Sequence, residues 1–129
     1  MDGWYVFRVR FQLRTADAEV GVEADPDTFE TVVRLPAAPP GDGEGRWRFF
    51  EEWLWRGELT DAERFEPVVE AWLSVPVLSV RFSELVVDGA YLDAWTDAVA
   101  DEVDRYNAAS AREVRHQHLG SSIRVTGTD

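Results

Sequence analysis

The chain has 129 residues, of which 25 are aspartate or glutamate and 13 are arginine, with no lysine and no cysteine. The net charge of −12 and the lack of cysteine indicate one acidic intracellular domain and exclude a disulfide scaffold, a thiolate metal site and a cysteine nucleophile. Charge repulsion on such a surface falls in concentrated salt, which predicts a salt-adapted, cytoplasmic protein. No apolar run approaches roughly 18 residues, so no membrane association is expected.

The first strand is predicted over residues 4–14, where apolar and polar side chains alternate. Its apolar face consists of Tyr5, Phe7, Val9, Phe11 and Leu13. A second strand is predicted over residues 29–35, which are rich in β-branched side chains. Residues 36–45 contain prolines and glycines throughout and predict a flexible loop.

A helix is predicted over residues 47–56, because a turn of about 100° per residue gathers most of its aromatic side chains on one side. Trp55 falls outside this apolar arc. The alternative is a strand with one buried face formed by Trp47, Phe49, Trp53 and Trp55. Thr60 and Glu63 match a capping box and predict the next helix, which Pro67 should kink or restart.

Alternation returns over residues 77–87 and predicts a third strand, whose apolar face is formed by Leu78, Val80 and Phe82. Residues 88–106 predict a long amphipathic helix with an apolar arc of Tyr91, Leu92, Trp95, Ala98, Val99, Val103 and Tyr106. A capping box then predicts a short helix over residues 111–119, and a final strand is expected over residues 121–126.

This order of elements predicts a two-layer α+β fold in which residues 1–129 form a single domain. The expected sheet is small and mostly antiparallel, with three or four strands. Helices are expected to pack on one face of the sheet, against the apolar side of the first strand.

The arginines Arg8, Arg10 and Arg14 form a positive row on the polar face of the first strand and could face an anion. The alternative is that Glu30, which shares a face of the second strand with Arg34, neutralises part of this row by cross-strand pairing. Nucleic-acid binding depends on neutralising phosphates with cations, which the net charge of −12 opposes. We therefore expect no nucleic-acid partner.

The segment Leu54-Trp55-Arg56 is the strongest candidate for an interaction with another protein. Tryptophan and arginine are among the residue types most enriched at interface hot spots, and Trp55 lies off the apolar arc. The alternative is that Trp55 belongs to the core, as large aromatic side chains often do. An exposed Trp55 would favour the interaction site.

Glu102 lies in the middle of the apolar arc of the predicted long helix. A buried carboxylate without a partner is costly, so we expect a salt bridge with Arg105 or with an arginine from the facing element, such as Arg56. The alternative is a side chain that reaches water at the edge of the helix.

No catalytic residue is predicted. The serines have no histidine and aspartate near them in a recognisable order, and paired carboxylates are too frequent in this composition to be diagnostic. His116 and His118 diverge by about 200° on a helix and could not both reach one ion. We therefore expect neither a metal nor another cofactor.

Short segments along nearly the whole chain occur in a distinctive order: Tyr5-Val-Phe-Arg-Val-Arg-Phe, Phe29-Glu-Thr, Pro39-Pro-Gly41, Phe49-Phe50, Leu54-Trp-Arg-Gly-Glu58, Tyr91-Leu92 and Leu119-Gly-Ser-Ser-Ile123. Together they resemble the LWR-salt proteins of halophilic archaea. The resemblance implies a haloarchaeal cytoplasmic protein, in agreement with the acidic, lysine-free composition. It implies no activity, because the function of this family is uncharacterised.

The sequence therefore favours a non-enzymatic module that binds or regulates a protein partner through the region of Trp55 and Arg56. The alternative is a small enzyme or an anionic-ligand-binding protein with a pocket of arginines and carboxylates. A flat exposed aromatic patch would favour the first hypothesis. A pocket lined by several arginines and a carboxylate would favour the second.

Overall fold

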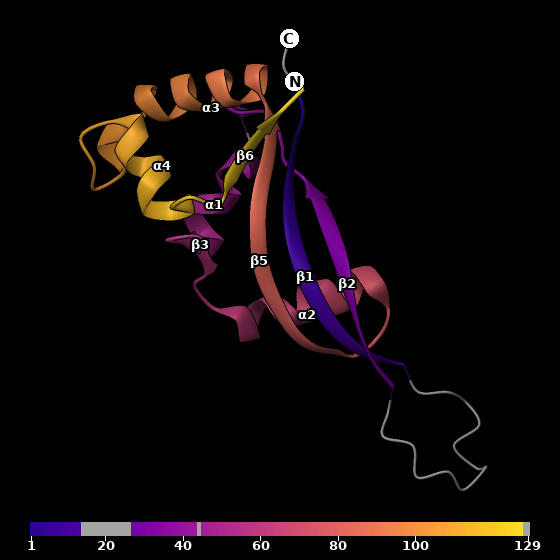
Figure 1. The fold of residues 1–129 in the computed structure, drawn as a ribbon. Coiled ribbons are helices and arrows are strands. Elements are labelled where there is room, and N and C mark those ends of the chain that lie inside the picture. The colour runs from indigo at the N-terminus through magenta and orange to yellow at the C-terminus, as the bar shows by residue number, and fades with distance from the viewer. Residues whose placement is uncertain (14–26, 44, 128–129) are drawn as a thin grey trace, which may run out of the picture.

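The computed structural model describes residues 1–13, 27–43 and 45–127. Its main sheet has the strand order β2-β1-β5-β6 (Figure 1), formed by β1 (Gly3–Leu13), β2 (Asp27–Pro36), β5 (Val77–Asp88) and β6 (Ile123–Thr126). β1 pairs antiparallel with both β2 and β5, whereas β6 runs parallel to β5. The predicted small sheet is confirmed, but its last pair of strands makes it mixed.

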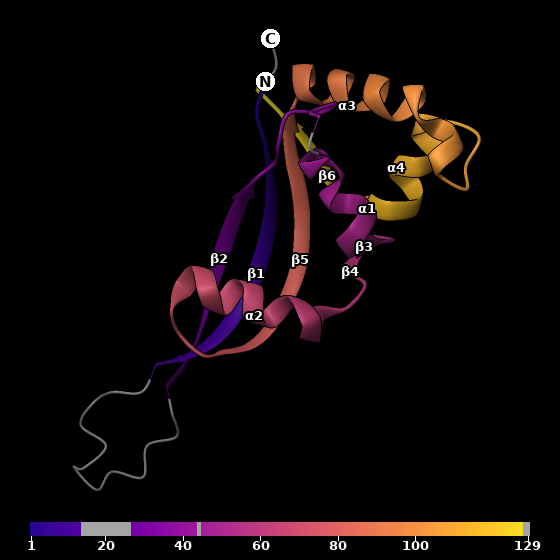
Figure 2. The same cartoon turned by 180° about the vertical axis from the view of Figure 1, so that it is seen from behind.

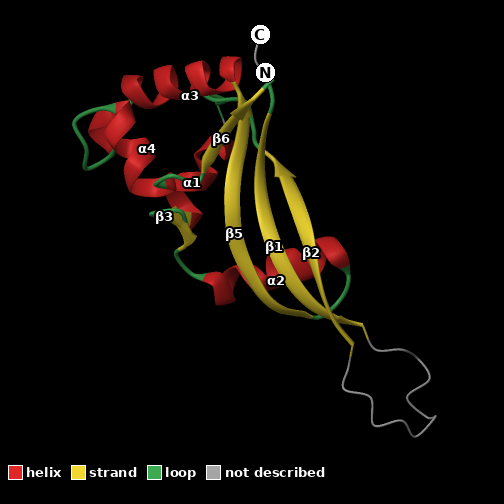
Figure 3. Cartoon of the chain, in the orientation of Figure 1, coloured by secondary structure: helices red, strands yellow, loops and turns green. Residues whose placement is uncertain are grey.

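The helices in the described part of the chain are α1 (Phe49–Trp53), α2 (Ala62–Leu73), α3 (Gly89–Asp101) and α4 (Ala111–Leu119). A second, two-stranded sheet is formed by β3 (Leu54–Trp55) and β4 (Glu58–Leu59). Figures 1 and 2 show the helices on one side of the main sheet, and Figure 3 shows its other face open. The two-layer α+β prediction is confirmed. None of the described helices is both long and apolar enough to cross a bilayer.

The apolar face of β1 forms the centre of the core, as predicted. Tyr5, Phe7 and Val9 are at most 1% exposed. The Phe7 ring lies 5.1 Å from that of Phe65 on α2 and 5.8 Å from that of Phe82 on β5, so the sheet and a helix share one aromatic cluster. Aromatic pairs at these distances stabilise a core beyond the area that they bury.

The predicted apolar face of the third strand is wrong at Leu78, which is 42% exposed. The pairing of β1 with β5 shifts register twice, between Val6 and Phe7 and between Arg10 and Phe11. Each irregularity adds a residue that breaks strict alternation. The β5 side chains that reach the core are therefore Val77, Val80, Phe82, Leu85 and Val87.

The single helix predicted over residues 47–56 is also wrong. A 3₁₀ turn at Arg46–Arg48 leads into the short α1, and the chain becomes extended at Leu54 with φ −122° and ψ 140°. A tight hairpin follows, in which Arg56 and Gly57 both have positive φ, 53° and 80°. A two-residue hairpin loop needs two such residues, and a helix cannot contain them.

The helix predicted over residues 88–106 begins as expected but ends at Asp101. The Asp88 carboxylate accepts a hydrogen bond from the Tyr91 backbone N–H at 2.8 Å, which caps α3. A 3₁₀ turn, Val103–Arg105, replaces the predicted last turn and changes the direction of Glu102.

The two remaining helices follow their capping signals only in part. The N-cap of α2 is Asp61 rather than Thr60, and α2 runs through Pro67 without the predicted restart. In α4 the Ser110 hydroxyl accepts from the Glu113 backbone N–H at 3.2 Å, so this predicted cap is confirmed.

Candidate functional site

A cleft of about 950 Å³ opens between the chain that follows β2 and the start of α1. One wall is apolar and consists of residues 35–39 together with Phe49. The charged lining consists of Arg46, Arg48, Glu51, Glu52 and Arg105. The volume of this cleft is in the range of small-molecule sites, and charged side chains make up a large part of its lining.

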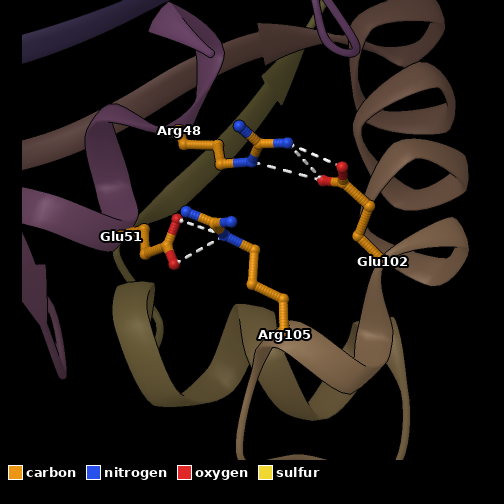
Figure 4. Close-up of polar contacts among 4 residues, drawn as sticks. All are labelled: Arg48, Glu51, Glu102 and Arg105. Atoms are coloured by element: carbon orange, nitrogen blue, oxygen red, sulfur yellow. Dashed lines mark hydrogen bonds and ion pairs between the residues drawn. The ribbon is translucent and has the colours of Figure 1, made fainter.

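Arg48 and Glu102 form the shortest ion pair of the cleft region (Figure 4). Arg48 Nη2 donates to both carboxylate oxygens of Glu102, at 2.7 and 2.6 Å, and Arg48 Nε donates to Oε2 at 3.2 Å. These hydrogen bonds from Arg48 lower the pKa of Glu102, and the same contact raises the pKa of Arg48. Charge-assisted contacts of this kind fix the orientation of the guanidinium plane.

Arg105 and Glu51 form a second ion pair between the same two segments (Figure 4). In this pair the arginine follows α3 and the glutamate lies on α1, which is the reverse of the first pair. Arg105 Nε donates to the Glu51 carboxylate oxygens at 2.9 and 3.1 Å. The charge of Arg105 also contributes to the lowered pKa of Glu102, because the two pairs lie close together. Two carboxylates therefore hold two guanidinium groups beside one cleft.

Both guanidinium groups retain unused donors. Arg48 uses its Nε and Nη2, so its Nη1 has no acceptor among the described residues. Arg105 uses only its Nε, so neither of its terminal nitrogens has an acceptor among the described residues. Guanidinium N–H groups held in a fixed plane match the two oxygens of a carboxylate. The cleft thus contains positioned donors for an oxyanion.

Two tyrosine hydroxyls beside this cluster are buried and have no hydrogen-bond partner in the described structure. Tyr5 lines the cleft and is 1% exposed, and burial raises its pKa well above the ordinary value. The nearby Phe50 backbone lowers the pKa of Tyr5 in part, but it forms no hydrogen bond with the Tyr5 hydroxyl. Burial and the charge of Glu51 raise the pKa of Tyr106 to about 12. Both hydroxyls stay protonated at neutral pH, and each is enclosed by the protein with an unused hydrogen-bonding group.

The hairpin between β3 and β4 uses its polar groups differently. The Arg56 backbone N–H donates to the Gln117 carbonyl at 2.7 Å, and the Gly57 N–H donates to the His118 carbonyl at 3.0 Å. These carbonyls belong to the last turn of α4, where no intrahelical donor remains for them. The His118 ring, through Nδ1, lies 2.8 Å from the Leu54 carbonyl. The hairpin therefore caps the C-terminus of α4.

A family model described as LWR-salt protein matches residues 1–129. The chain belongs to the LWR-salt family. Searches of curated proteins and of solved structures each found no match. The family resemblance seen in the sequence is therefore confirmed.

In this LWR-salt protein the residues Leu54, Trp55 and Arg56 have unequal environments. Leu54 is fully buried, so it belongs to the core rather than to an interaction surface. Trp55 is 44% exposed and packs edge-to-face on His118 with a centroid distance of 5.3 Å. The Arg56 side chain has no partner among the described residues, and only its backbone is engaged. Trp55 and Arg56 remain the surface part of the motif.

The predicted arginine row of the LWR-salt protein lies on the open face of the sheet. Arg8 contacts Glu30 at 3.4 Å, which is the cross-strand pairing considered as the alternative, and Arg8 lies directly opposite Arg81. Arg8, Arg10 and Arg81 line a shallow depression of about 280 Å³. The third predicted member, Arg14, lies outside the described residues.

Glu102 is paired with an arginine from a facing segment, which is one of the two predicted arrangements, but this arginine is Arg48 rather than the suggested Arg56. Its partner is Arg48, because the helix ends before Glu102 and the 3₁₀ turn directs the side chain toward the start of α1. The Glu102 side chain is 40% exposed, so it also reaches water and is not the buried carboxylate that the helical arc predicted.

The sequence did not identify Arg48, Glu51, Arg105, Tyr5 or Tyr106 as site residues. One signal could have found the charged ones: Arg48 precedes Glu51 by three residues, and Glu102 precedes Arg105 by three residues with the charges reversed. Side chains three residues apart lie on the same side of a helical turn. Two such turns that face each other can therefore form two ion pairs, each between the arginine of one turn and the glutamate of the other. No sequence signal shows that the tyrosine hydroxyls lack partners.

Proposed function

We propose that this LWR-salt protein binds a small organic carboxylate in the cleft, without changing it chemically. The observation that carries the proposal is the presence of spare guanidinium N–H groups on Arg48 and Arg105, which Glu102 and Glu51 hold in place. A ligand carboxylate can accept from these groups while the two ion pairs stay formed. Preorganised donors of this kind reduce the ordering cost of binding.

The apolar wall supports a ligand with an apolar body. Residues 35–39 and Phe49 contribute aliphatic, proline and aromatic surface opposite the charged groups. Short aliphatic or aromatic monocarboxylates combine these features.

The ionisation of the cleft residues supports binding over acid–base catalysis. The pKa of Glu102 is lowered by its hydrogen bonds with Arg48, which makes this carboxylate a weak base. The raised pKa of Tyr5 makes its hydroxyl a weak acid that stays protonated. Neither group is suited to move protons near neutral pH, and the ionised Glu102 serves to hold the Arg48 guanidinium in place.

The test is calorimetric titration of the folded protein with benzoate, and with benzamide as the neutral analogue. We expect benzoate to bind and Arg105→Gln to weaken it at least about tenfold, because one charge-assisted donor is lost. The matched control is Arg124→Gln. Arg124 holds Glu84 at 2.9 Å with 58% and 27% exposure of the two side chains, close to the 2.9 Å, 50% and 27% of Arg105 and Glu51.

The control separates the cleft from general surface charge. Arg124 lies on β6, outside the cleft lining, so its loss should leave benzoate binding unchanged. Equal weakening by both variants, or benzamide binding as tightly as benzoate, would contradict the proposed carboxylate site.

A second candidate function is the binding of a protein partner through Trp55 and Arg56. It is supported by the exposed Trp55 ring and by the Arg56 side chain, for which the described residues supply no partner. Affinity capture in concentrated KCl, with Trp55→Ala/Arg56→Ala as the control bait, tests it. A partner held equally by both baits would argue against this surface.

We also propose a salt-rich cytoplasm as the environment of the protein, on the strength of the net charge of −12. The Debye length shrinks from about 30 Å at 0.01 M salt to about 3 Å at 1 M, so repulsion between surface carboxylates is screened. Melting temperatures should rise with KCl over this range. A flat profile would remove the main support for salt adaptation.

A further inference from the structure

We propose that two copies of this chain associate through the outer edge of β2 and form one continuous sheet. β2 is an edge strand of ten residues, Asp27–Pro36, and pairs only with β1 in the described structure. Figure 3 shows its other side open. An unpaired strand of this length presents a row of backbone donors and acceptors that favours pairing with another strand.

β2 lacks two of the usual protections of an edge strand, namely a bulge and a proline in its middle. Its pairing with β1 is regular from Trp4 and Pro36 to Leu13 and Asp27, so no bulge twists the edge away. Its proline is the last residue and leaves the middle of the strand free to pair. Val32 is 49% exposed in that middle. An exposed β-branched residue at the centre of a regular edge strand suits an interface.

The sequence of β2 is self-complementary in one register. In a symmetric antiparallel pair of identical strands, one residue lies directly opposite its own copy, and the two-fold axis passes between these two residues. The reason is that directly opposite side chains must lie on the same face of the sheet. An axis at Val32 places Glu30 opposite Arg34 of the second copy, and the symmetry repeats this pair. An axis at Glu30 or at Arg34 would oppose like charges, which is unfavourable.

The two charged residues are available for this pairing. Arg34 makes no ion pair or hydrogen bond in the described part of the chain. Glu30 has only the long contact of 3.4 Å with Arg8, where both side chains are about half exposed. The second copy would therefore supply Arg34 with its first acidic partner and Glu30 with a second basic one.

The same register has a consequence for the cleft. On the helix side of the sheet it places the exposed Phe29 of one copy opposite Leu35 of the other. Leu35 lines the cleft, so the dimer would place an aromatic ring of the second copy beside the apolar wall. Association would then influence the ligand site without blocking its charged side.

Charge-exchange variants test the register. Glu30→Arg alone and Arg34→Glu alone each place two like-charge pairs across the symmetric dimer. Mixing the two variants creates a heterodimer in which both cross-strand pairs have opposite charges. Sedimentation equilibrium of wild type, each variant and the mixture, at about 0.15 and 1 M KCl, measures the association under weak and strong screening.

The wild type should sediment with twice the 14.7 kDa mass of the chain. Each single variant should raise the dissociation constant at least about tenfold, and the equimolar mixture should recover it. The double variant Glu30→Arg/Arg34→Glu, which restores both pairs within a homodimer, keeps the test valid if one single variant folds poorly. A monomeric wild type, or single variants that dimerise as tightly as the wild type, would overturn the proposal.

Discussion

The β3–β4 hairpin and the arginine cleft are neighbours in the chain, yet they use arginine and aromatic residues in opposite ways. In the hairpin the backbone amides of Arg56 and Gly57 are bonded to α4, and the Arg56 side chain contacts no partner within residues 1–13, 27–43 and 45–127. In the cleft the side chains of Arg48 and Arg105 are bonded, and some of their donors have no acceptor in that same part of the chain. The hairpin completes the fold, whereas the cleft has unused binding capacity.

This contrast shows that the residues of the Leu-Trp-Arg motif and those of the best candidate site are different. Leu54 fills the core, and the positive φ of Arg56 and Gly57 turns the chain onto the end of α4. The Leu-Trp-Arg motif therefore marks a buried residue and a turn that the fold requires, rather than a ligand site. The chemistry suited to a ligand lies on side chains a few residues before the motif and at the end of α3.

The largest expected effect is that of Leu54→Ala. Leu54 is fully buried and its carbonyl lies 2.8 Å from His118 Nδ1, so truncation leaves a cavity where the hairpin meets α4. We expect a loss of about 2–5 kcal/mol in unfolding free energy, measured by urea denaturation. Benzoate binding by the fraction that remains folded should be unchanged. A nearly neutral Leu54→Ala would break the assignment of the hairpin to the fold.

The next largest effect is that of Gly57→Ala. Gly57 has φ +80°, and an added Cβ would lie 2.6 Å from Ser122 Oγ and 3.0 Å from the Leu119 carbonyl oxygen. The left-handed conformation and the crowding together should cost about 1–3 kcal/mol in unfolding free energy.

Gly41→Ala is the matched control for this substitution. Gly41 has φ +81°, but the nearest atom to its added Cβ is Ala98 Cβ at 4.0 Å. The difference between the two variants therefore measures the close contact of the hairpin with α4. Equal losses of stability would show that only the backbone conformation, and not the contact, is required.

A smaller effect is expected for Trp55→Ala. The ring is 44% exposed and its aromatic contact is with His118, so we expect a loss of about 0.5–1.5 kcal/mol. Trp47→Ala is the control, because Trp47 is 1% exposed and its loss should cost about 3–5 kcal/mol. Thermal melts of both variants compare the two positions. Similar losses would place Trp55 energetically in the core and weaken its role as a partner surface.

Local patterns predicted the parts of the fold that local physics controls. The alternation in β1 and the periodicity of α3 correctly identified Tyr5, Phe7, Trp95 and Val99 as core residues. The failures occurred where a few residues change the geometry. The hairpin at Arg56 and Gly57 ended a predicted helix, and one register shift of β5 against β1 left Leu78 facing outward.

The candidate site was harder to predict because it depends on tertiary contacts. Arg48 and Glu102 are 54 residues apart, and only the end of α3 directs Glu102 toward Arg48. The side-chain types were visible in the sequence, and the need of Glu102 for a partner was correctly expected. The identity of that partner required the position of one helix end relative to another segment.

The smallest expected effect concerns the pH dependence of the Arg48–Glu102 pair. The folded pKa of Glu102 is lowered, chiefly by its hydrogen bonds with Arg48. A lowered folded pKa gives stability that is fully present above the unfolded value, about 4.3 for glutamate, and is lost as the pH falls through the folded value. The stability difference between wild type and Glu102→Gln should therefore be constant near neutral pH and shrink below about pH 4.3.

Many other carboxylates titrate in the same range, so a double-mutant comparison is needed to isolate Glu102. In an Arg48→Gln background the hydrogen bonds that lower the pKa of Glu102 are absent. The change in unfolding free energy caused by Glu102→Gln should then vary little with pH over this range. The effect is small because Glu102 is 40% exposed and solvent screens the pair. Urea denaturation of the four proteins from pH 3 to pH 7 measures it. A pH-dependent difference that persists without Arg48 would show that another group, such as Arg105, controls the ionisation of Glu102.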